Sequence, residues 1–116
     1  NHAKYLNNQL NYSEIITPFV PVGYKHVYQM YTIKLDESID RIAFLKHLRN
    51  DGIGASVHFD PPVHSQPFYK KNNFDLPVTD KVAKSIVTLP MYPSLSLEDL
   101  DYMVFSIGNA INSSKK

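Results

Sequence analysis

Residues 26–59, HVYQMYTIKLDESIDRIAFLKHLRNDGIGASVHF, alternate between the patterns of a strand and a helix, and they decide the fold class. From His26 to Leu35, aromatic and β-branched residues follow one another without glycine or proline, which predicts a strand. From Ile53 to Phe59, apolar residues alternate with small or polar ones, which predicts a second strand with His58 facing away from the core. A strand, a helix and a strand in this order indicate an α/β domain.

The segment between these strands has the features of a helix. Ser38 lies in the position of an N-cap, beside acidic side chains that the positive end of a helix favours. Gly52 supplies the left-handed residue at which the helix ends. The predicted buried face repeats at helical spacing: Ile42, Phe44, Leu45 and Leu48.

The flanking segments complete a small sandwich. Residues 2–12 predict a short helix, and the proline-rich stretch 17–23 predicts a connector near a domain boundary. Thr79 is a candidate cap for a short helix that precedes a third strand at 86–89, and Ser96 to Asp99 resembles the capping box of a last amphipathic helix. We therefore expect an α/β fold of the α+β sandwich kind, with a mainly antiparallel sheet of about three strands covered by helices.

Composition limits the function classes. The chain has 116 residues, enough for one domain, with 12 basic and 11 acidic residues and a net charge of +1. Such a balance without a dense basic run argues against a nucleic-acid partner, and no apolar run reaches the roughly 18 residues of a membrane helix. The absence of cysteine excludes disulfides and thiol nucleophiles, and it suits the cytoplasm, which is our predicted location. Because the chain begins at Asn1, we expect a longer natural protein.

The densest group of polar side chains lies in residues 58–69, directly after the second predicted strand and around several prolines. His58, Asp60 and His64 could form a two-histidine, one-carboxylate metal set, but their spacing matches no strict motif, so we predict no metal site. Either histidine also suits acid–base chemistry near neutral pH, although no nucleophile or orienting partner is evident. The remaining alternative is a proline-stiffened loop whose histidines only form hydrogen bonds.

Four segments, in order, resemble the C-terminal, smaller domain of the DegT/DnrJ/EryC1/StrS aminotransferases. They are residues 26–33, 48–54, 58–69 and 88–93, the third being similar to the family pattern H-[FY]-x-P-x-H-x-Q-P-x-Y. The resemblance extends from about Ala3 to Ile111. It implies a part of a homodimeric, pyridoxal-phosphate-dependent enzyme that transfers an amino group from glutamate or glutamine to keto sugars, usually nucleotide-linked. The expected fold is then the small domain of fold-type I transferases.

The resemblance also implies how the chain is organised. Residues 1–22 would be a helix tail and linker from a missing N-terminal domain, residues 23–112 the C-terminal small domain, and residues 113–116 a flexible tail. The lysine that bonds pyridoxal phosphate would lie in the missing domain. We therefore expect no catalytic residue and no bound cofactor in this chain, which would be inactive alone.

What this domain would contribute is one wall of the substrate cleft. The resemblance implies these substrate-binding candidates: His58, His64, Gln66, Tyr69 and Gln29. His58 is the first choice, whereas Gln29 stands where many relatives have histidine, so a role there is an open question. Two alternatives remain, a non-catalytic module that binds a sugar nucleotide or a protein, and a structural domain without a ligand.

Overall fold

The computed structural model describes residues 1–116 and contains four α-helices, three strands and two short 3-10 helices. The helices are α1 (His2–Gln9), α2 (Arg41–Asn50), α3 (Pro77–Ser85) and α4 (Leu97–Ser113), and the 3-10 helices are η1 (Val63–Ser65) and η2 (Lys70–Asn72). The strands are β1 (Ile15–Ile16), β2 (Tyr31–Leu35) and β3 (Ile86–Leu89). They form one antiparallel sheet in the order β1-β2-β3, which confirms the predicted α+β sandwich.

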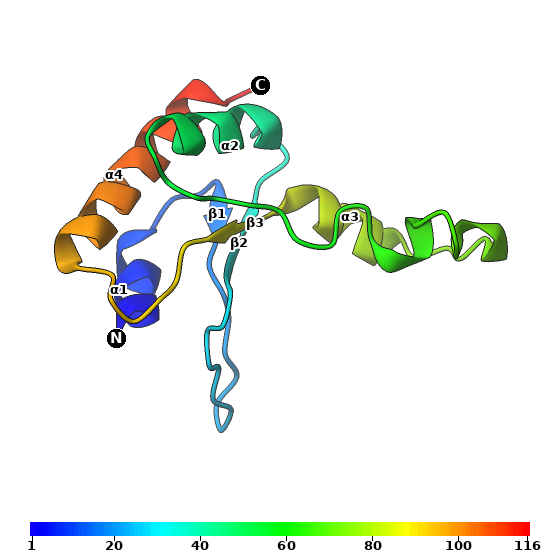
Figure 1. Ribbon diagram of the computed structural model, residues 1–116, viewed down its shortest axis with the longest axis horizontal. Helices are drawn as coiled ribbons and strands as arrows, with labels where there is room; N and C mark the ends of the chain where they lie inside the picture. Colours follow the sequence, from blue (N-terminus) through cyan, green and yellow to red (C-terminus); the bar gives the residue numbers. More distant parts are fainter.

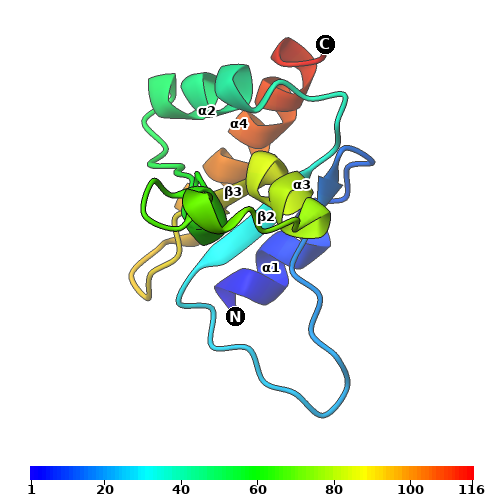
Figure 2. The same ribbon diagram turned by 90° about the vertical axis from the view of Figure 1, so that its right-hand side faces the viewer.

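Helices cover the two faces of this sheet unequally (Figures 1 and 2). Helices α1, α2 and α4 lie on one side, and α3 alone lies on the other. In β2, Tyr31, Ile33 and Leu35 are buried, whereas the residues between them are half-buried. Since side chains alternate along a strand, the buried set faces the three helices. The opposite side, which contains Thr32 of β2 and its partner Thr88 of β3, is called the outer face below.

The first sixteen residues belong to this fold. Leu6 of α1 and Ile15 of β1 are part of a single core of 21 buried residues, and β1 pairs with β2. The buried hydroxyl of Tyr31 donates a hydrogen bond of 2.5 Å to Asn7 Oδ1, which fastens α1 to the sheet, and burial raises the pKa of Tyr31. The sequence predicted that residues 1–22 are a helix tail and linker from another domain, but α1 and β1 pack into this domain and only the part after β1 leaves it.

Of the two predicted long strands, one is shorter than expected and the other is absent. Strand β2 begins at Tyr31 rather than His26, because Tyr28 has a φ of 52° and the chain before Tyr31 belongs to a long loop. Residues 53–59 form no strand, and Ser56 alone bridges to Thr88 at the edge of β3. Phe59, with a φ of 59°, then turns the chain away from the sheet. Neither left-handed residue is a glycine, so composition did not indicate these turns.

Two predicted helix caps are wrong. Asp40, not Ser38, caps α2, because its Oδ1 accepts hydrogen bonds from the amides of Ile42 and Ala43. Ile42 is consequently placed outward and is 78 % exposed, although the rest of the predicted buried face of α2 is correct. Thr79 does not cap α3, which already begins at Pro77 with Leu76 as its N-cap. The stop at Gly52, with a φ of 79°, is confirmed.

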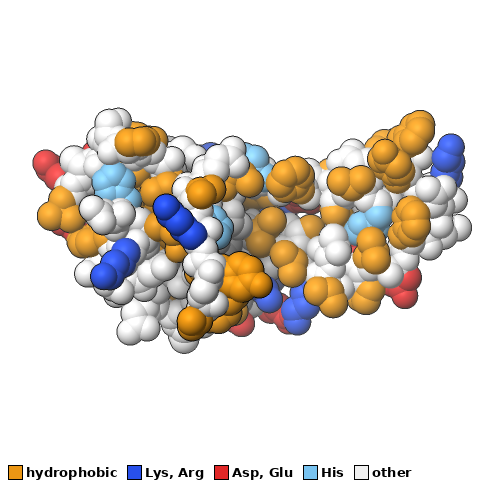
Figure 3. All heavy atoms as spheres, turned by 90° about the horizontal axis from the view of Figure 1, so that it is seen from below, with side chains coloured by type: hydrophobic (Ala, Val, Ile, Leu, Met, Phe, Trp, Pro, Cys, Tyr) orange, Lys and Arg blue, Asp and Glu red, His pale blue; other side chains and the backbone are white.

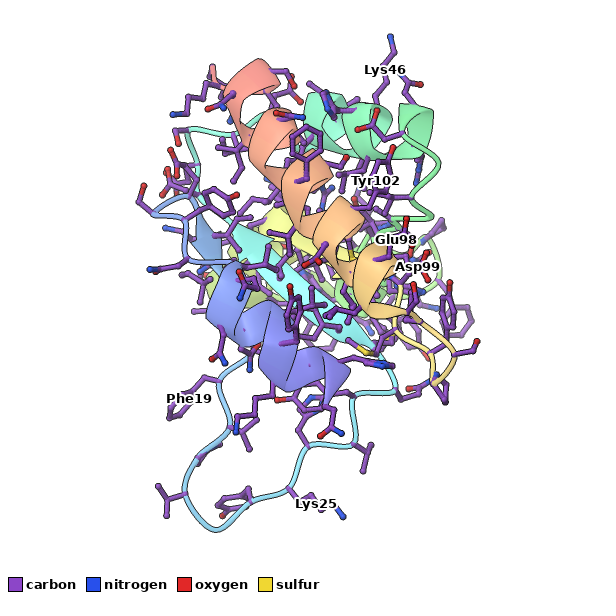
Figure 4. The ribbon with its side chains drawn as sticks, turned by 90° about the vertical axis from the view of Figure 1, so that its left-hand side faces the viewer. Phe19, Lys25, Lys46, Glu98, Asp99 and Tyr102 are labelled. Carbon is purple, nitrogen blue, oxygen red and sulfur yellow. The ribbon has the colours of Figure 1, made fainter.

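The last helix agrees with the prediction, and the C-terminal residues after it are hydrogen-bonded to the rest of the domain. The capping box of Ser96 and Asp99 is present at the start of α4, which Figure 4 shows in front of the sheet. Residues 113–116, where the sequence predicts a flexible tail, are held in place. Ser114 is buried, and the amide of Lys116 donates to Ser38 O. These bonds join the end of the chain to the loop before α2.

Two segments project from this body. One is the hairpin loop, residues 17–30, on which Phe19 and Lys25 point away from the rest of the protein (Figure 4). The other is the arm, residues 59–85, which contains η1, η2 and α3 and extends to the right in Figure 1. They raise the radius of gyration to 15.2 Å, whereas a compact domain of this length has about 13 Å. No helix is long and apolar enough to cross a membrane.

Candidate functional site

His58 lies on the outer face of the sheet, as the alternation of residues 53–59 predicted. Its Nδ1 is 3.1 Å from Thr88 Oγ1, which is in turn 3.2 Å from Thr32 Oγ1. Thr32 and Thr88 are register partners, so the two hydroxyls and the imidazole form a row across the sheet. His58 is exposed, and its Nε2 has no partner in the protein. It is therefore available to a ligand.

Gln29 lies near the same row. It lines a hollow of about 340 Å³ together with Pro18, His26 and Thr32. Because Thr32 belongs both to this hollow and to the row that ends at His58, the structure places Gln29 and His58 on one side of the sheet. Gln29 itself is exposed.

His64 is on the arm, in η1, and faces α3. Its Nε2 is 2.8 Å from Asp80 Oδ1, and its side chain is only 9 % exposed. Since an ionised carboxylate can only accept, the Nε2 atom carries the proton in this pair. The Nδ1 atom has no protein partner and is not among the buried unsatisfied atoms, so it reaches solvent. Asp80 thus holds His64 in one tautomer with one nitrogen free.

A groove of about 640 Å³ runs along the arm beside this pair. Aromatic and aliphatic side chains dominate it, and His64, Asn72 and Thr79 supply its polar groups. Its remaining lining is Phe59, Pro62, Val63, Tyr69, Phe74 and Leu76. Tyr69 packs edge-on against Phe68, with 5.0 Å between the ring centroids. The groove therefore contains two of the predicted site residues, His64 and Tyr69, and it suits a ring with a polar edge.

Gln66 supports the arm rather than the groove. Its Nε2 donates a hydrogen bond of 2.8 Å to Pro61 O, across the turn that begins at Asp60. The five candidates therefore lie in two groups, Gln29 and His58 beside the outer face of the sheet and the other three on the arm. None of the five belongs to the hydrophobic core.

The metal hypothesis fails on geometry. His58 bonds to Thr88, His64 bonds to Asp80, and Asp60 pairs with Arg41 at 2.5 Å. The chain contains no group of three or more histidine, aspartate or glutamate side chains close enough to hold an ion. The three side chains point toward three different elements, because their partners Thr88, Asp80 and Arg41 lie in β3, α3 and α2.

Sequence reasoning missed the partners of these residues. Thr88, Asp80 and Arg41 each bond to a residue of the 58–69 segment, at separations of 16 to 30 positions along the chain. Such pairs leave no local pattern. The sequence could have indicated only that the polar groups of this loop need charged or hydroxyl partners, and not which residues supply them.

The residues present do not fit pyridoxal phosphate, the cofactor that the resemblance implies. The cofactor needs a lysine amine in a partly dehydrated site. Lys34 is the only lysine of this chain that is partly buried, the others being exposed, and it lines a hollow with four other cationic side chains. The pKa of Lys81 is raised by its hydrogen bond with Glu37, which is opposite to what a nucleophilic amine requires.

Comparison with known proteins agrees with the fold. A sequence profile described as the DegT/DnrJ/EryC1/StrS aminotransferase family matches residues 1–108. The chain is 32% identical to the spore coat polysaccharide biosynthesis protein SpsC of Bacillus subtilis, over 84% of this chain and 27% of that protein. It is 31% identical to the UDP-2-acetamido-2-deoxy-3-oxo-D-glucuronate aminotransferase of Pseudomonas aeruginosa, over 80% of this chain and 25% of that enzyme.

A solved structure shows the same similarity in three dimensions. The crystal structure of a DegT DnrJ EryC1 StrS aminotransferase from Brucella abortus superposes with a TM-score of 0.82 and 26% identity, over 95% of this chain and 29% of that one. The chain thus spans between about a quarter and a third of the proteins that it matches.

Proposed function

Because this chain belongs to the DegT/DnrJ/EryC1/StrS aminotransferase family, we propose that it is the C-terminal small domain of an enzyme that aminates nucleotide-linked keto sugars. The enzyme would act in the synthesis of amino sugars or polysaccharides, as the names of SpsC and the Pseudomonas aminotransferase suggest. The amino donor would be glutamate or glutamine. Pyridoxal phosphate would supply the reactive carbonyl, held by a domain that this chain does not contain.

One observation supports a substrate-binding role above the others. All five candidate residues lie outside the core, on the outer face of the sheet or on the arm. A domain that stabilised only its neighbours would have no need for an accessible imidazole fixed by a row of hydroxyls. His58 would donate or accept a hydrogen bond at a sugar hydroxyl through Nε2, because Thr88 already occupies Nδ1.

The arm would bind the other part of the substrate. The groove beside His64 is apolar, with a free imidazole nitrogen at one point, and this chemistry suits a flat ring with hydrogen-bonding groups. A nucleobase has this character. Tyr69 and Phe74 would pack against the ring, and His64 Nδ1 would accept a hydrogen bond from its edge. Gln66 would keep the turn at Pro61 in shape.

The proposal includes a homodimer and a location in the cytoplasm. Large hydrophobic side chains are exposed along the arm, where several groups of them lie on the face that Figure 3 shows. Monomeric proteins rarely expose such a surface, so it accords with a partner domain or subunit. The chain has no cysteine, which a reducing compartment permits.

The decisive experiment is to mix this 116-residue chain with pyridoxal phosphate, reduce with borohydride and map adducts by mass spectrometry. We expect no stoichiometric adduct at any single lysine, since every lysine except the partly buried Lys34 is exposed and Lys34 lies among other cationic side chains. A single complete adduct would show that the lysine that anchors the cofactor is in this chain, and it would overturn the proposal that another domain holds the cofactor. The full-length gene product, assayed in parallel, should form 2-oxoglutarate from glutamate in the presence of a UDP-linked keto sugar.

Substitution of His58 tests the site itself. In the full-length enzyme, His58→Ala should raise KM for the sugar nucleotide roughly tenfold or more, because it removes a hydrogen bond to the substrate. His2→Ala, a histidine at the start of α1, is the matched control and should leave KM unchanged. Equal kinetics for the two variants would remove His58 from the site. A gene product without amino transfer would instead favour the non-catalytic binding module.

A further inference from the structure

Arg41 connects the body of the protein to both ends of the arm. It is the first residue of α2, and its side chain is 17 % exposed. Its Nη2 donates to Asp60 Oδ2 at 2.5 Å, where the chain enters the arm. Its Nη1 donates to the carbonyl oxygens of Ala83 and Ile86, where the chain returns from α3 to β3. One guanidinium thus joins three points, as its planar fork of donors permits.

The arm depends on such contacts because it has almost no core of its own. Ala83 is the only buried residue between positions 59 and 85. The long apolar side chains of the arm are exposed instead, Phe68 to 71 % and Val78 to 75 %. Without interior packing, the orientation of a projecting segment is determined by the bonds at its base.

The bonds at the base are few. Besides Arg41, the contact between His58 and Thr88 joins the two ends of the arm, and Ser56 bridges to Thr88 just outside it. Those contacts lie along the edge of β3 and do not reach α2. Lys81 of α3 also pairs with Glu37 in the loop before α2, at 2.8 Å, but both side chains are mostly exposed, and such surface pairs contribute little. Arg41 is therefore the side chain that fixes the arm relative to the helical layer, through a charge-assisted pair that is stronger than a neutral hydrogen bond.

We propose that Arg41 is a positioning residue, which holds the arm, and with it His64 and Tyr69, at one angle to His58 on the sheet. The link to substrate rests on the proposed function, because it requires His58 beside the sheet and the residues of the arm to bind the same ligand. The position of the arm does not depend on that function, since it follows from the three hydrogen bonds of Arg41. Arg41 does not touch the substrate.

Hydrogen exchange on this chain tests the brace. In Arg41→Ala, backbone amides of α3 should exchange roughly 10- to 100-fold faster, since a charged group with three hydrogen bonds is lost. Amides of α4 should be unchanged. Arg41→Lys should not restore protection, because a single ammonium cannot reach both ends of the arm. Unchanged exchange in α3, or equal acceleration in α4, would overturn the proposal.

The chain offers a matched control on the same helix. Arg49, the only other arginine, also donates to a backbone oxygen, that of Ala55, but makes no contact with the arm. Arg49→Ala should leave α3 as protected as in the wild type. Should Arg41→Ala fail to fold, Asp60→Ala removes one of the three bonds and should still loosen α3 severalfold. Normal protection in Asp60→Ala would then count against the brace.

Kinetics of the full-length enzyme separate positioning from a merely structural role. Arg41→Ala should raise KM for the sugar nucleotide several-fold, because part of the binding free energy of the substrate is then used to order the arm. The kcat at saturation should stay within about twofold, because the arm is already ordered in the enzyme–substrate complex. An unchanged KM, together with a loosened α3, would refute the link to substrate. If the wild-type enzyme transfers no amino group, the proposed function fails, and the exchange result still decides the brace.

Discussion

The body and the arm of this protein use hydrophobic residues in opposite ways. In the body, 21 buried side chains form one core, and most of them come from α1, α2, α4 and the sheet. In the arm, Phe59, Val63, Phe68 and Phe74 are all more than half exposed. The same residue types therefore stabilise one region and prepare the other for contact with something else. Apolar composition alone therefore does not show which residues hold a domain together.

The largest expected difference between body and arm comes from removing a large side chain. Leu48→Ala, in a fully buried position of α2, should lower the free energy of unfolding by about 2–5 kcal/mol. Phe68→Ala, at a position that is 71 % exposed on the arm, should change it by less than about 0.5 kcal/mol. Urea denaturation of both variants measures this. Equal losses would mean that the arm shares the cooperative core.

Left-handed residues give the next comparison. Gly52, with a φ of 79°, ends α2, and a methyl group there would meet no atom within 4 Å. Gly52→Ala should therefore lower the free energy of unfolding by about 1–2 kcal/mol through backbone strain alone. Asn73, with a φ of 50°, makes the turn at the tip of the arm. We expect Asn73→Ala to leave global unfolding unchanged, and a loss matching that of Gly52→Ala would contradict the separation of the two regions.

Helix starts provide a smaller test. Ser96→Ala removes the cap of α4 and should lower the free energy of unfolding by about 1 kcal/mol. Thr79→Ala lies inside α3, not at its cap, and should be neutral within about 0.5 kcal/mol. Thermal unfolding followed by circular dichroism compares them. A loss in Thr79→Ala would revive the cap that the sequence predicted.

The smallest effect concerns acid. Hydrogen bonds from the backbone and side chain of Ser96 lower the pKa of Asp99 below its ordinary 3.8. A lowered folded pKa gives stability that is present above the unfolded pKa and is lost as pH falls through the folded one. Asp99→Asn should thus be less stable than the wild type at neutral pH, and the difference in stability should shrink in strong acid. Melting temperatures across this range would refute the assignment if the difference stayed constant.

Local patterns predicted much of the body correctly. The capping box at Ser96, the stripe of α4 and the third strand at 86–89 all rest on neighbours within a few positions, and the structure confirms each. The outward direction of His58 followed from the alternation of residues 53–58, although this segment forms only one bridge and the alternation ends at Phe59, which is 69 % exposed. Such features depend on short-range geometry that a sequence displays directly.

Predictions failed where distant residues decide. Strand β2 starts at Tyr31 because its partners in β3 reach no further than Leu89, which no local pattern between His26 and Met30 reveals. The helix α1 joins the core through Asn7 and Tyr31, so the proline-rich stretch after β1 is a loop within the domain and not a boundary. The candidate site was predicted as a list of residues, but its division between sheet and arm was not.

The sequence by itself determined the family, the fold class, the last helix with its cap and the polar segment 58–69, because each depends on residue types in a short, ordered pattern. Only the tertiary structure decided that Asp80 orients His64, that Thr88 holds His58 and that Arg41 braces the arm. Those pairs form between residues 16 to 30 positions apart. Each contact forms only when two elements that are distant in the chain have met in the folded protein, so no local pattern of residues indicates it.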